Sequence, residues 1–257
     1  MLEIIKTRIS QGHRTARYPK VQPTLPDRFR GRPVINQDNI DAHTLETLPK
    51  LCATGALCST ASGGLTLDMG KCLFCGRCDV CNPSGKKAVT FSNDHRLAAR
   101  SRDDLRISTT QNSVAPSRLD DERLRLFRRS LRLRQVSAGG CNACEADINV
   151  LNTLVFDLSR FGIQFVASPR HADGLIITGP VTKNMALALR KTFDATPAPK
   201  VVIAVGACAI SGGMFAAHDQ VHHGAEDLLP VDLFIPGCPP HPYTILDGLL
   251  RLLGRID

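Results

Sequence analysis

The spacing of its cysteines is the feature that most constrains this chain. The early group comprises Cys52, Cys58, Cys72, Cys75, Cys78 and Cys81, and the late group comprises Cys141, Cys144, Cys208 and Cys238. The sequence contains no apolar run of the roughly 18 residues that a membrane span needs, and no secretory signal core precedes the cysteines. We therefore expect a cytoplasmic protein with reduced thiols. Two groups of such thiols predict metal or cluster ligation in two modules.

Composition divides the chain into four segments. Residues 1–50 form a basic, proline-containing lead, and residues 51–97 form a module rich in cysteine and glycine. Residues 98–119 are polar and indicate a linker, whereas residues 120–257 carry the remaining cysteines within alternating strand and helix patterns. The sequence thus predicts a small domain joined to a larger one.

The positive charge is concentrated in two of these segments. The net charge is +8, and the lead and the run from Arg123 to Arg134 hold much of the excess. The run is compatible with a solvated face or with a docking surface for an acidic partner or anionic lipid headgroups. A nucleic-acid groove is disfavoured, because only one aromatic residue, Phe127, lies among these arginines.

Strand and helix patterns alternate after residue 130. Strands are expected over residues 131–136, 162–167, 174–178, 201–205 and 231–235, and helices over 145–160, 183–193 and 243–253. This alternation is typical of βαβ units. It predicts an α/β domain in which a parallel sheet is covered by helices on both faces.

The four late cysteines all follow expected strands. Because the carboxyl ends of parallel strands share one edge of a sheet, residues distant in sequence can converge there. Four thiolates can hold a 4Fe-4S cluster or a zinc ion, and four buried structural thiols are the third reading. Flanking glycines, such as Gly140 and Gly237, let the backbone approach a bulky cluster and favour the first reading.

The early group contains the pattern Cys-x2-Cys-x2-Cys at Cys72, Cys75 and Cys78. Three such ligands wrap one cubane and need a fourth cysteine from elsewhere. Cys52 is our candidate for that ligand, with Cys58 and Cys81 as alternatives. A zinc ribbon is a weaker interpretation, because evenly spaced triplets differ from two separated knuckles.

Four motifs in residues 130–254 together resemble one family. They are Gly139-Gly140-Cys141-Asn142-Ala143-Cys144-Glu145, Ser168-Pro169-Arg170-His171-Ala172-Asp173, Val205-Gly206-Ala207-Cys208-Ala209-Ile210-Ser211-Gly212-Gly213 and Pro236-Gly237-Cys238-Pro239-Pro240. The family is the small subunit of membrane-bound, energy-converting nickel–iron hydrogenases, especially of the formate hydrogenlyase type, and it is homologous to a cluster-bearing subunit of respiratory complex I. The resemblance implies a flavodoxin-like α/β domain with a proximal 4Fe-4S cluster on Cys141, Cys144, Cys208 and Cys238.

Residues 1–100 resemble a second subunit of the same complexes, the ferredoxin-like iron–sulfur subunit of formate hydrogenlyase. The segments that carry this likeness are Leu2–Lys6, Tyr18-Pro19, Phe29–Pro33 and Lys71–Cys78. The Cys52-Ala53-Thr54-Gly55-Ala56 turn resembles the turn that donates the remote ligand in bacterial ferredoxins, and Val89–Phe91 would be the closing strand. The first ligand loop of two-cluster ferredoxins would fall on Ala42, Leu45 and Leu48, which cannot bind iron. The resemblance therefore implies a small ferredoxin-like α+β domain with one 4Fe-4S cluster on Cys52, Cys72, Cys75 and Cys78.

Together the two resemblances imply an electron-transfer subunit carrying two 4Fe-4S clusters. Its expected partners are a large catalytic subunit, an electron donor such as formate dehydrogenase or ferredoxin, and membrane-arm subunits, with no nucleic acid. Its expected location is peripheral, on the cytoplasmic face of the inner membrane. The alternatives are a complex I-like quinone or ferredoxin oxidoreductase without nickel and, more distantly, a zinc-stabilised nucleic-acid-binding module.

Two further sites have alternative interpretations. In the hydrogenases a glutamate at the position of Glu145 lies near a proton route, whereas stabilisation of the following helix would also explain it. Arg170 and His171 follow an expected strand and would tune a nearby cluster by charge, unless they belong to a surface loop.

Overall fold

The computed structural model describes residues 2–81, 85–109 and 118–256. The second half of the chain is built on a five-stranded sheet in which every neighbouring pair is parallel, in the order β10-β9-β8-β6-β7. Its strands are β6 (Leu131–Ser137), β7 (Ile163–Phe165), β8 (Gly174–Thr178), β9 (Val201–Val205) and β10 (Leu233–Ile235). The predicted parallel sheet is confirmed. Strands β8 and β9 are continuous apolar runs because both of their faces are covered.

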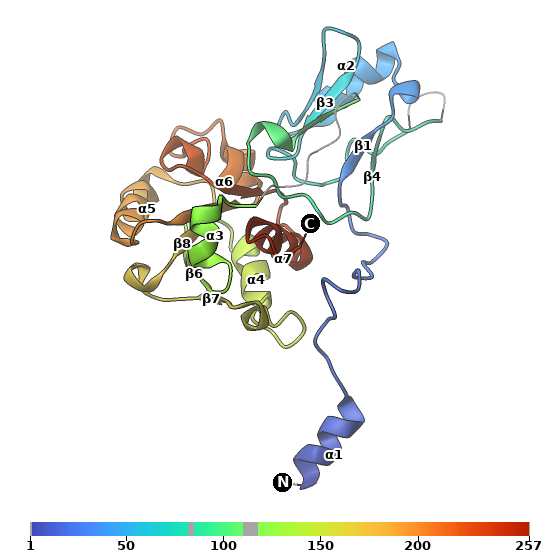
Figure 1. Ribbon diagram of the computed structural model, residues 1–257. Helices are drawn as coiled ribbons and strands as arrows, with labels where there is room; N and C mark the ends of the chain where they lie inside the picture. The colour runs from blue at the N-terminus through green and yellow to red at the C-terminus, as the bar shows by residue number, and fades with distance from the viewer. Residues whose placement is uncertain (1, 82–84, 110–117, 257) are drawn as a thin grey trace.

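Helices cover both faces of this sheet (Figure 1). One apolar core places Ile177 of β8 with Leu189 of α5 (Lys183–Ala195) and Ala209 of α6 (Ala207–Ser211). The neighbouring Ile176 points to the opposite face. The other core lies beneath the remaining helices, which are α3 (Asp121–Phe127), α4 (Ala143–Val150) and α7 (Pro242–Leu252). The domain is therefore a three-layered α/β fold, as the sequence predicts.

The helix predicted over residues 145–160 ends early. Helix α4 stops at Val150, and turns then lead to a short 3-10 helix over Leu158–Phe161. The hydroxyl of Thr153 donates to the carbonyl of Val150 at 2.7 Å, so a side chain competes with the helical backbone there. Leu154 continues the apolar spacing of Ile148 and Leu151, which predicts that it is buried, but it is 68% exposed.

The first half of the chain forms two small antiparallel sheets. Strand β1 (Pro33–Ile35) pairs with β4 (Val89–Phe91), and β3 (Leu65–Asp68) pairs with both β2 (Leu57–Ser59) and β5 (Arg106–Ser108). Helix α2 (Ala42–Leu51) contacts β2. The expected small α+β region is therefore present, and Val89–Phe91 is a strand as predicted.

This region extends beyond the predicted module. Strand β1 and helix α2 belong to the segment assigned to the lead, and β5 belongs to the segment assigned to the linker. Polar composition concealed β5, in which Ile107 is buried opposite Leu67. Residues 110–117 of the predicted linker lie outside the described residues.

Backbone and side-chain bonds fix the small region against the α/β domain. Ala99 and Phe234 exchange two backbone hydrogen bonds, of 3.0 and 2.8 Å, beside β10. The hydroxyl of Ser211, in α6, donates to the carbonyl of Gly70 at 2.9 Å. These contacts lie close to the cysteines of both groups and so hold the two groups side by side.

The chain begins with α1 (Leu2–Gln11), which projects away from the body in Figure 1. The segment after it returns to the α/β domain, where the Tyr18 hydroxyl donates to Asp247 of α7 at 2.6 Å. Within the described residues, no helix is both long enough and apolar enough to cross a bilayer.

Candidate functional site

The four late cysteines gather at the carboxyl edge of the parallel sheet. Cys141 lies in the loop after β6, Cys144 and Cys208 lie in the first turns of α4 and α6, and Cys238 follows β10. Burial raises the pKa of the Cys144 thiol, and so do Glu145 and the charges of the other three thiolates. Burial also raises the pKa of Cys208 to about 11, with Cys238 and Cys141 adding to the shift. The structure thus brings together the four residues that the sequence singled out.

Glycines hold the backbone unusually close to these sulfurs. A Cβ at Gly206 would lie 2.5 Å from the Cys144 Sγ, and a Cβ at Gly213 would lie 2.9 Å from the Cys208 Sγ. Gly206 also has a φ of +89°, which disfavours other residues. The Gly206 N–H donates to Ile235 at 2.8 Å, and this bond ties the Cys208 loop to the end of β10. The glycines therefore clear the space around the sulfurs.

Four early cysteines converge in the same manner. Cys52, Cys72, Cys75 and Cys78 line one cavity with apolar walls that include Leu57, Leu67 and Phe91. Burial raises the pKa of Cys72 to about 12, and the charges of Cys78, Cys52 and Cys75 add to the shift. Burial opposes ionisation of Cys52 as well, but its pKa is lowered because backbone N–H groups and the Thr54 hydroxyl bond to its sulfur. One of these is the Ala56 N–H, 3.2 Å from Sγ.

The other two early cysteines lie outside this cavity. Cys58 is exposed on β2, with its Sγ 3.6 Å from the carbonyl of Gly55. Cys81 lines a separate cavity of about 140 Å³ that also contacts Leu48. Leu48 is one of the positions at which two-cluster ferredoxins carry a ligand, and here it is a buried residue of α2. The structure therefore favours Cys52 among the three candidates for the fourth ligand.

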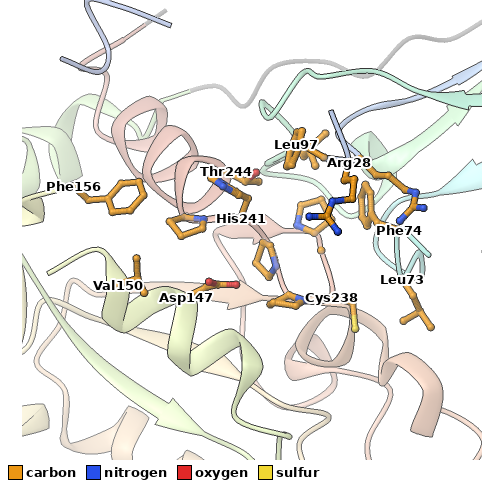
Figure 2. Close-up of a pocket in the computed structure, with 17 residues that line it drawn as sticks. Arg28, Leu73, Phe74, Leu97, Asp147, Val150, Phe156, Cys238, His241 and Thr244 are labelled. Atoms are coloured by element: carbon orange, nitrogen blue, oxygen red, sulfur yellow. The ribbon is translucent and has the colours of Figure 1, made fainter. Parts of the chain in front are cut away.

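The two thiol groups approach each other at Cys75 and Cys238. The pKa of Cys238 is raised first by burial, then by the charge of Cys141 and then by that of Cys75. An open cavity of about 530 Å³ lies beside this junction (Figure 2). It is lined from the lead by Phe29 and Arg30, from the cysteine module by Phe74, and from the α/β domain by Cys238 and residues of α4 and α7. The lead therefore reaches the place where the two groups meet.

Comparison with known proteins assigns the α/β domain. Residues 141–252 match the family described as NADH ubiquinone oxidoreductase, 20 Kd subunit. A probable membrane-bound hydrogenase subunit of Pyrococcus furiosus is 41% identical over 121 residues, which cover 47% of this chain and 72% of that protein. The chain belongs to the 20 Kd subunit family.

Other relatives of this 20 Kd family member come from both the hydrogenase and the complex I branches. Formate hydrogenlyase subunit 7 of Escherichia coli K12 is 42% identical over 134 residues, which cover 52% of each chain. A subunit of the NADH-quinone oxidoreductase of Citrifermentans bemidjiense is 46% identical over 117 residues, which cover 46% of this chain and 68% of that protein. The expected relationship to hydrogenase and complex I subunits is confirmed, and the chain is a subunit of an oxidoreductase.

Members of the 20 Kd family bind a 4Fe-4S cluster. The donor set of the late group suits one, because thiolates are the cluster's ligands and the glycines leave room around the sulfurs. Partly buried thiolates that repel one another need a cationic centre to compensate their charge. Among the described residues, no group of three or more His, Cys, Asp or Glu side chains is arranged closely enough to hold a single metal ion.

Glu145 is a buried carboxylate beside the late cysteines of this family member. Its Oε1 accepts hydrogen bonds from the hydroxyls of Ser137, at 2.5 Å, and Thr178, at 2.7 Å. The side chain is 5% exposed, and a Cβ at Gly140 would lie 3.3 Å from Oε1. A carboxylate held by two hydroxyls can hold or pass a proton, so its role in a proton route stays a prediction.

Arg170 and His171 lie at the other edge of the sheet. They line a groove of about 460 Å³ with Ser130 and Arg132, at the amino end of β6. The structure therefore favours the surface-loop interpretation of these two residues. Sequence reasoning gave no role to Phe29, Arg30 and Asp147, which line the cavity beside Cys238. The only signal for the first two was the likeness of Phe29–Pro33 to the ferredoxin-like subunit.

Proposed function

We propose that this chain is the electron-transfer small subunit of a membrane-associated nickel–iron hydrogenase complex of the formate hydrogenlyase type. In this proposal it holds two 4Fe-4S clusters, one on Cys52, Cys72, Cys75 and Cys78 and a proximal one on Cys141, Cys144, Cys208 and Cys238. The catalytic centre belongs to a separate large subunit. The observation that carries the proposal is that Cys75 lies near enough to Cys238 for its charge to act on the Cys238 thiol, which would let clusters on the two thiol groups exchange electrons.

The clusters would supply one-electron transfer, and the chain's residues would do the rest. Apolar side chains around the buried Cys72 limit the access of water to the cavity of the early group. The Phe74 N–H donates to the Cys72 Sγ at 3.3 Å, a type of bond that favours the thiolate. The backbone hydrogen bonds between Ala99 and Phe234 fix the position of the early cysteine group relative to the late group. A donor would deliver electrons to the cluster of the early group, and the cluster of the late group would exchange them with the large subunit.

The exposed parts of the late group suit a covering partner. Cys141 and Cys238 are the more exposed of the four residues, whereas Cys144 and Cys208 are half-buried. Because an oxidoreductase subunit without its own catalytic centre must hand electrons to another chain, an open side next to the cysteines fits docking of the large subunit. The exposed arginines at 125 and 129 offer a second surface for an acidic partner.

Helix α1 supports a peripheral place on the membrane. Leu2, Ile5 and Ile9 share one helix face and are 74%, 52% and 77% exposed, and Lys6 and Arg8 flank that face. An apolar face bordered by cations is the arrangement that binds the surface of an anionic bilayer. Together with the relatives' membrane-associated complexes, this supports our proposal that the chain lies on the cytoplasmic face of the inner membrane, next to membrane-arm subunits.

Metal analysis of anaerobically purified protein tests the cofactors. Two 4Fe-4S clusters predict about eight iron and about eight sulfide per chain. Zinc without sulfide would instead support the nucleic-acid-binding alternative. About four iron would leave the first cysteine group without a cluster and would remove the proposed electron path.

A complex I-like quinone or ferredoxin oxidoreductase is the second candidate, favoured by the 46% identity to a subunit of an NADH-quinone oxidoreductase. The Cys141-x-x-Cys144 spacing favours the hydrogenase, because the quinone-reducing relatives typically carry two adjacent cysteines. The large subunit that copurifies with this chain decides between them. Two Cys-x-x-Cys pairs in that subunit would indicate a nickel site, and their absence would refute the hydrogenase assignment.

A further inference from the structure

We propose that the positive charge of Arg30 raises the reduction potential of the cluster held by Cys52, Cys72, Cys75 and Cys78. This inference rests on the proposed function, since it assumes that this group holds a cluster. It assigns a role in electron transfer to the lead segment, which contains no cysteine. The argument depends on where the Arg30 guanidinium lies, on what holds it there and on its lack of a counter-charge.

The guanidinium of Arg30 packs on the backbone of Gly76, between Cys75 and Cys78. A Cβ built at Gly76 would lie 2.5 Å from the Arg30 Nε, 2.8 Å from its Cζ and 3.0 Å from its Nη2. Gly76 has a φ of +77°, a backbone conformation that glycine adopts readily. The loop of cluster ligands thus offers a flat surface on which a planar cation fits closely.

The backbone on both sides of Arg30 is anchored. The Gly31 N–H donates to Ser92 at 2.8 Å, and there is no room for a side chain at Gly31, because a Cβ would lie 2.2 Å from the carbonyl oxygen of Asp94. On the other side, the ring of Phe29 meets that of His241 edge to face, with centroids 5.4 Å apart. Arg30 is therefore held between the two halves of the chain, and it is one of the residues, with Phe74 and Cys238, that line the cavity shown in Figure 2.

Arg30 has no carboxylate partner within the described residues. Neighbouring arginines do have one: Arg32 pairs with Asp94 at 3.4 Å, and Arg102 with Asp68 at 2.6 Å. Reduction adds one negative charge to a cluster, so an unpaired cation next to its ligand loop stabilises the reduced form. Because Arg30 is also exposed to solvent, screening keeps this effect moderate.

A charge series at Arg30 tests the proposal in the holoprotein. The midpoint potential is measured by redox titration with electron paramagnetic resonance. The signal followed is that of the early-group cluster, identified as the signal that is absent from the Cys72→Ala variant. Arg30→Gln should lower the reduced-to-oxidised ratio at a fixed potential by about threefold. This corresponds to a midpoint potential lower by about 28 mV, at 59 mV per tenfold. Arg30→Lys keeps the positive charge and should retain most of the wild-type potential, whereas Arg30→Glu should lower the potential further than Arg30→Gln does. Arg190→Gln, on the exposed face of α5, should leave the potential unchanged.

Two results would overturn the inference. One is a potential that stays the same across the series while each variant keeps its iron and sulfide. The other is loss of this cluster from both Arg30→Gln and Arg30→Lys, which would mean that Arg30 holds the loop together and does not act through its charge. If the Cys72→Ala variant shows every signal that the wild-type protein shows, the proposed function has failed instead.

Discussion

Cys75 and Cys238 lie close enough for the charge of the Cys75 thiolate to raise the pKa of the Cys238 thiol. The two residues are far apart in sequence and belong to different halves of the chain. Their approach is fixed by backbone pairing between Ala99 and Phe234 and by the bond from Ser211 to Gly70. In the proposed function, this relationship connects the α/β domain with the small cysteine-rich region.

Removing one early thiol should remove one cluster. We expect Cys75→Ser to lower iron and sulfide from about eight to about four per chain, because three thiolates and a hydroxyl hold a cubane poorly. Cys58→Ser is the matched control, since Cys58 lies outside the cavity of the four thiols. An equal loss of iron in the control would contradict the assignment of the early ligands.

Glu145 offers a test that separates a proton route from a structural role. In Glu145→Gln an amide oxygen can still accept from Ser137 and Thr178, so the fold and the iron content should be retained. Hydrogen evolution by the assembled complex should fall strongly, since an amide does not carry protons at neutral pH. Unchanged turnover in this variant would refute the proton route.

Glu145→Ala provides the complementary measurement. It removes the carboxylate that accepts from the exposed Ser137 and from the buried Thr178, and the loss at Thr178 should lower the free energy of unfolding by about 1–3 kcal/mol in denaturant titrations. A cost near zero would mean that the two hydroxyls find other partners.

The lead should be anchored by Tyr18. Its hydroxyl donates to Asp247, which also accepts from Arg251 at 2.9 Å, and burial followed by the bond to Asp247 raises the pKa of Tyr18. Tyr18→Phe should therefore lower the free energy of unfolding by about 2 kcal/mol, since the lost bond goes to a buried charge. Tyr243→Phe is the control. Similar losses in both variants would show that the bond to Asp247 adds nothing beyond the loss of a hydroxyl and would contradict the anchoring role.

Helix α1 should bind anionic bilayers. The double variant Ile5→Asp, Ile9→Asp places charges on its exposed apolar face and should reduce cosedimentation with phosphatidylethanolamine–phosphatidylglycerol vesicles several-fold. Leu187→Asp changes an apolar residue of α5 that is 63% exposed, and it serves as the control. Equal binding by wild type and double variant would remove the support that α1 gives to a peripheral location.

Much of the fold could be predicted from the sequence because its signals are local. The apolar run Val201–Val205 marks a strand covered on both faces, and placing cysteines just after strands predicts their convergence. Strand β5 was concealed because its three residues gain stability from pairing with β3, a contact distant in sequence. The end of α4 was missed because Leu154 continues the apolar spacing although Thr153 interrupts the backbone bonding.

The junction between the modules could not be predicted at all. Arg30 stacks on Gly76 and Phe29 meets His241 only after both halves have folded, and no spacing in the sequence links these residues. The same holds for Cys75 and Cys238, whose individual roles were predictable but whose approach was not.

Electron paramagnetic resonance of the fully reduced holoprotein tests the central claim most directly. Two 4Fe-4S clusters whose ligands Cys75 and Cys238 are near enough for their charges to interact should give signals broadened or split by magnetic interaction, and Cys72→Ala should convert them into one sharp signal. A wild-type spectrum that already consists of a single non-interacting cluster, unchanged in Cys72→Ala, would contradict the account.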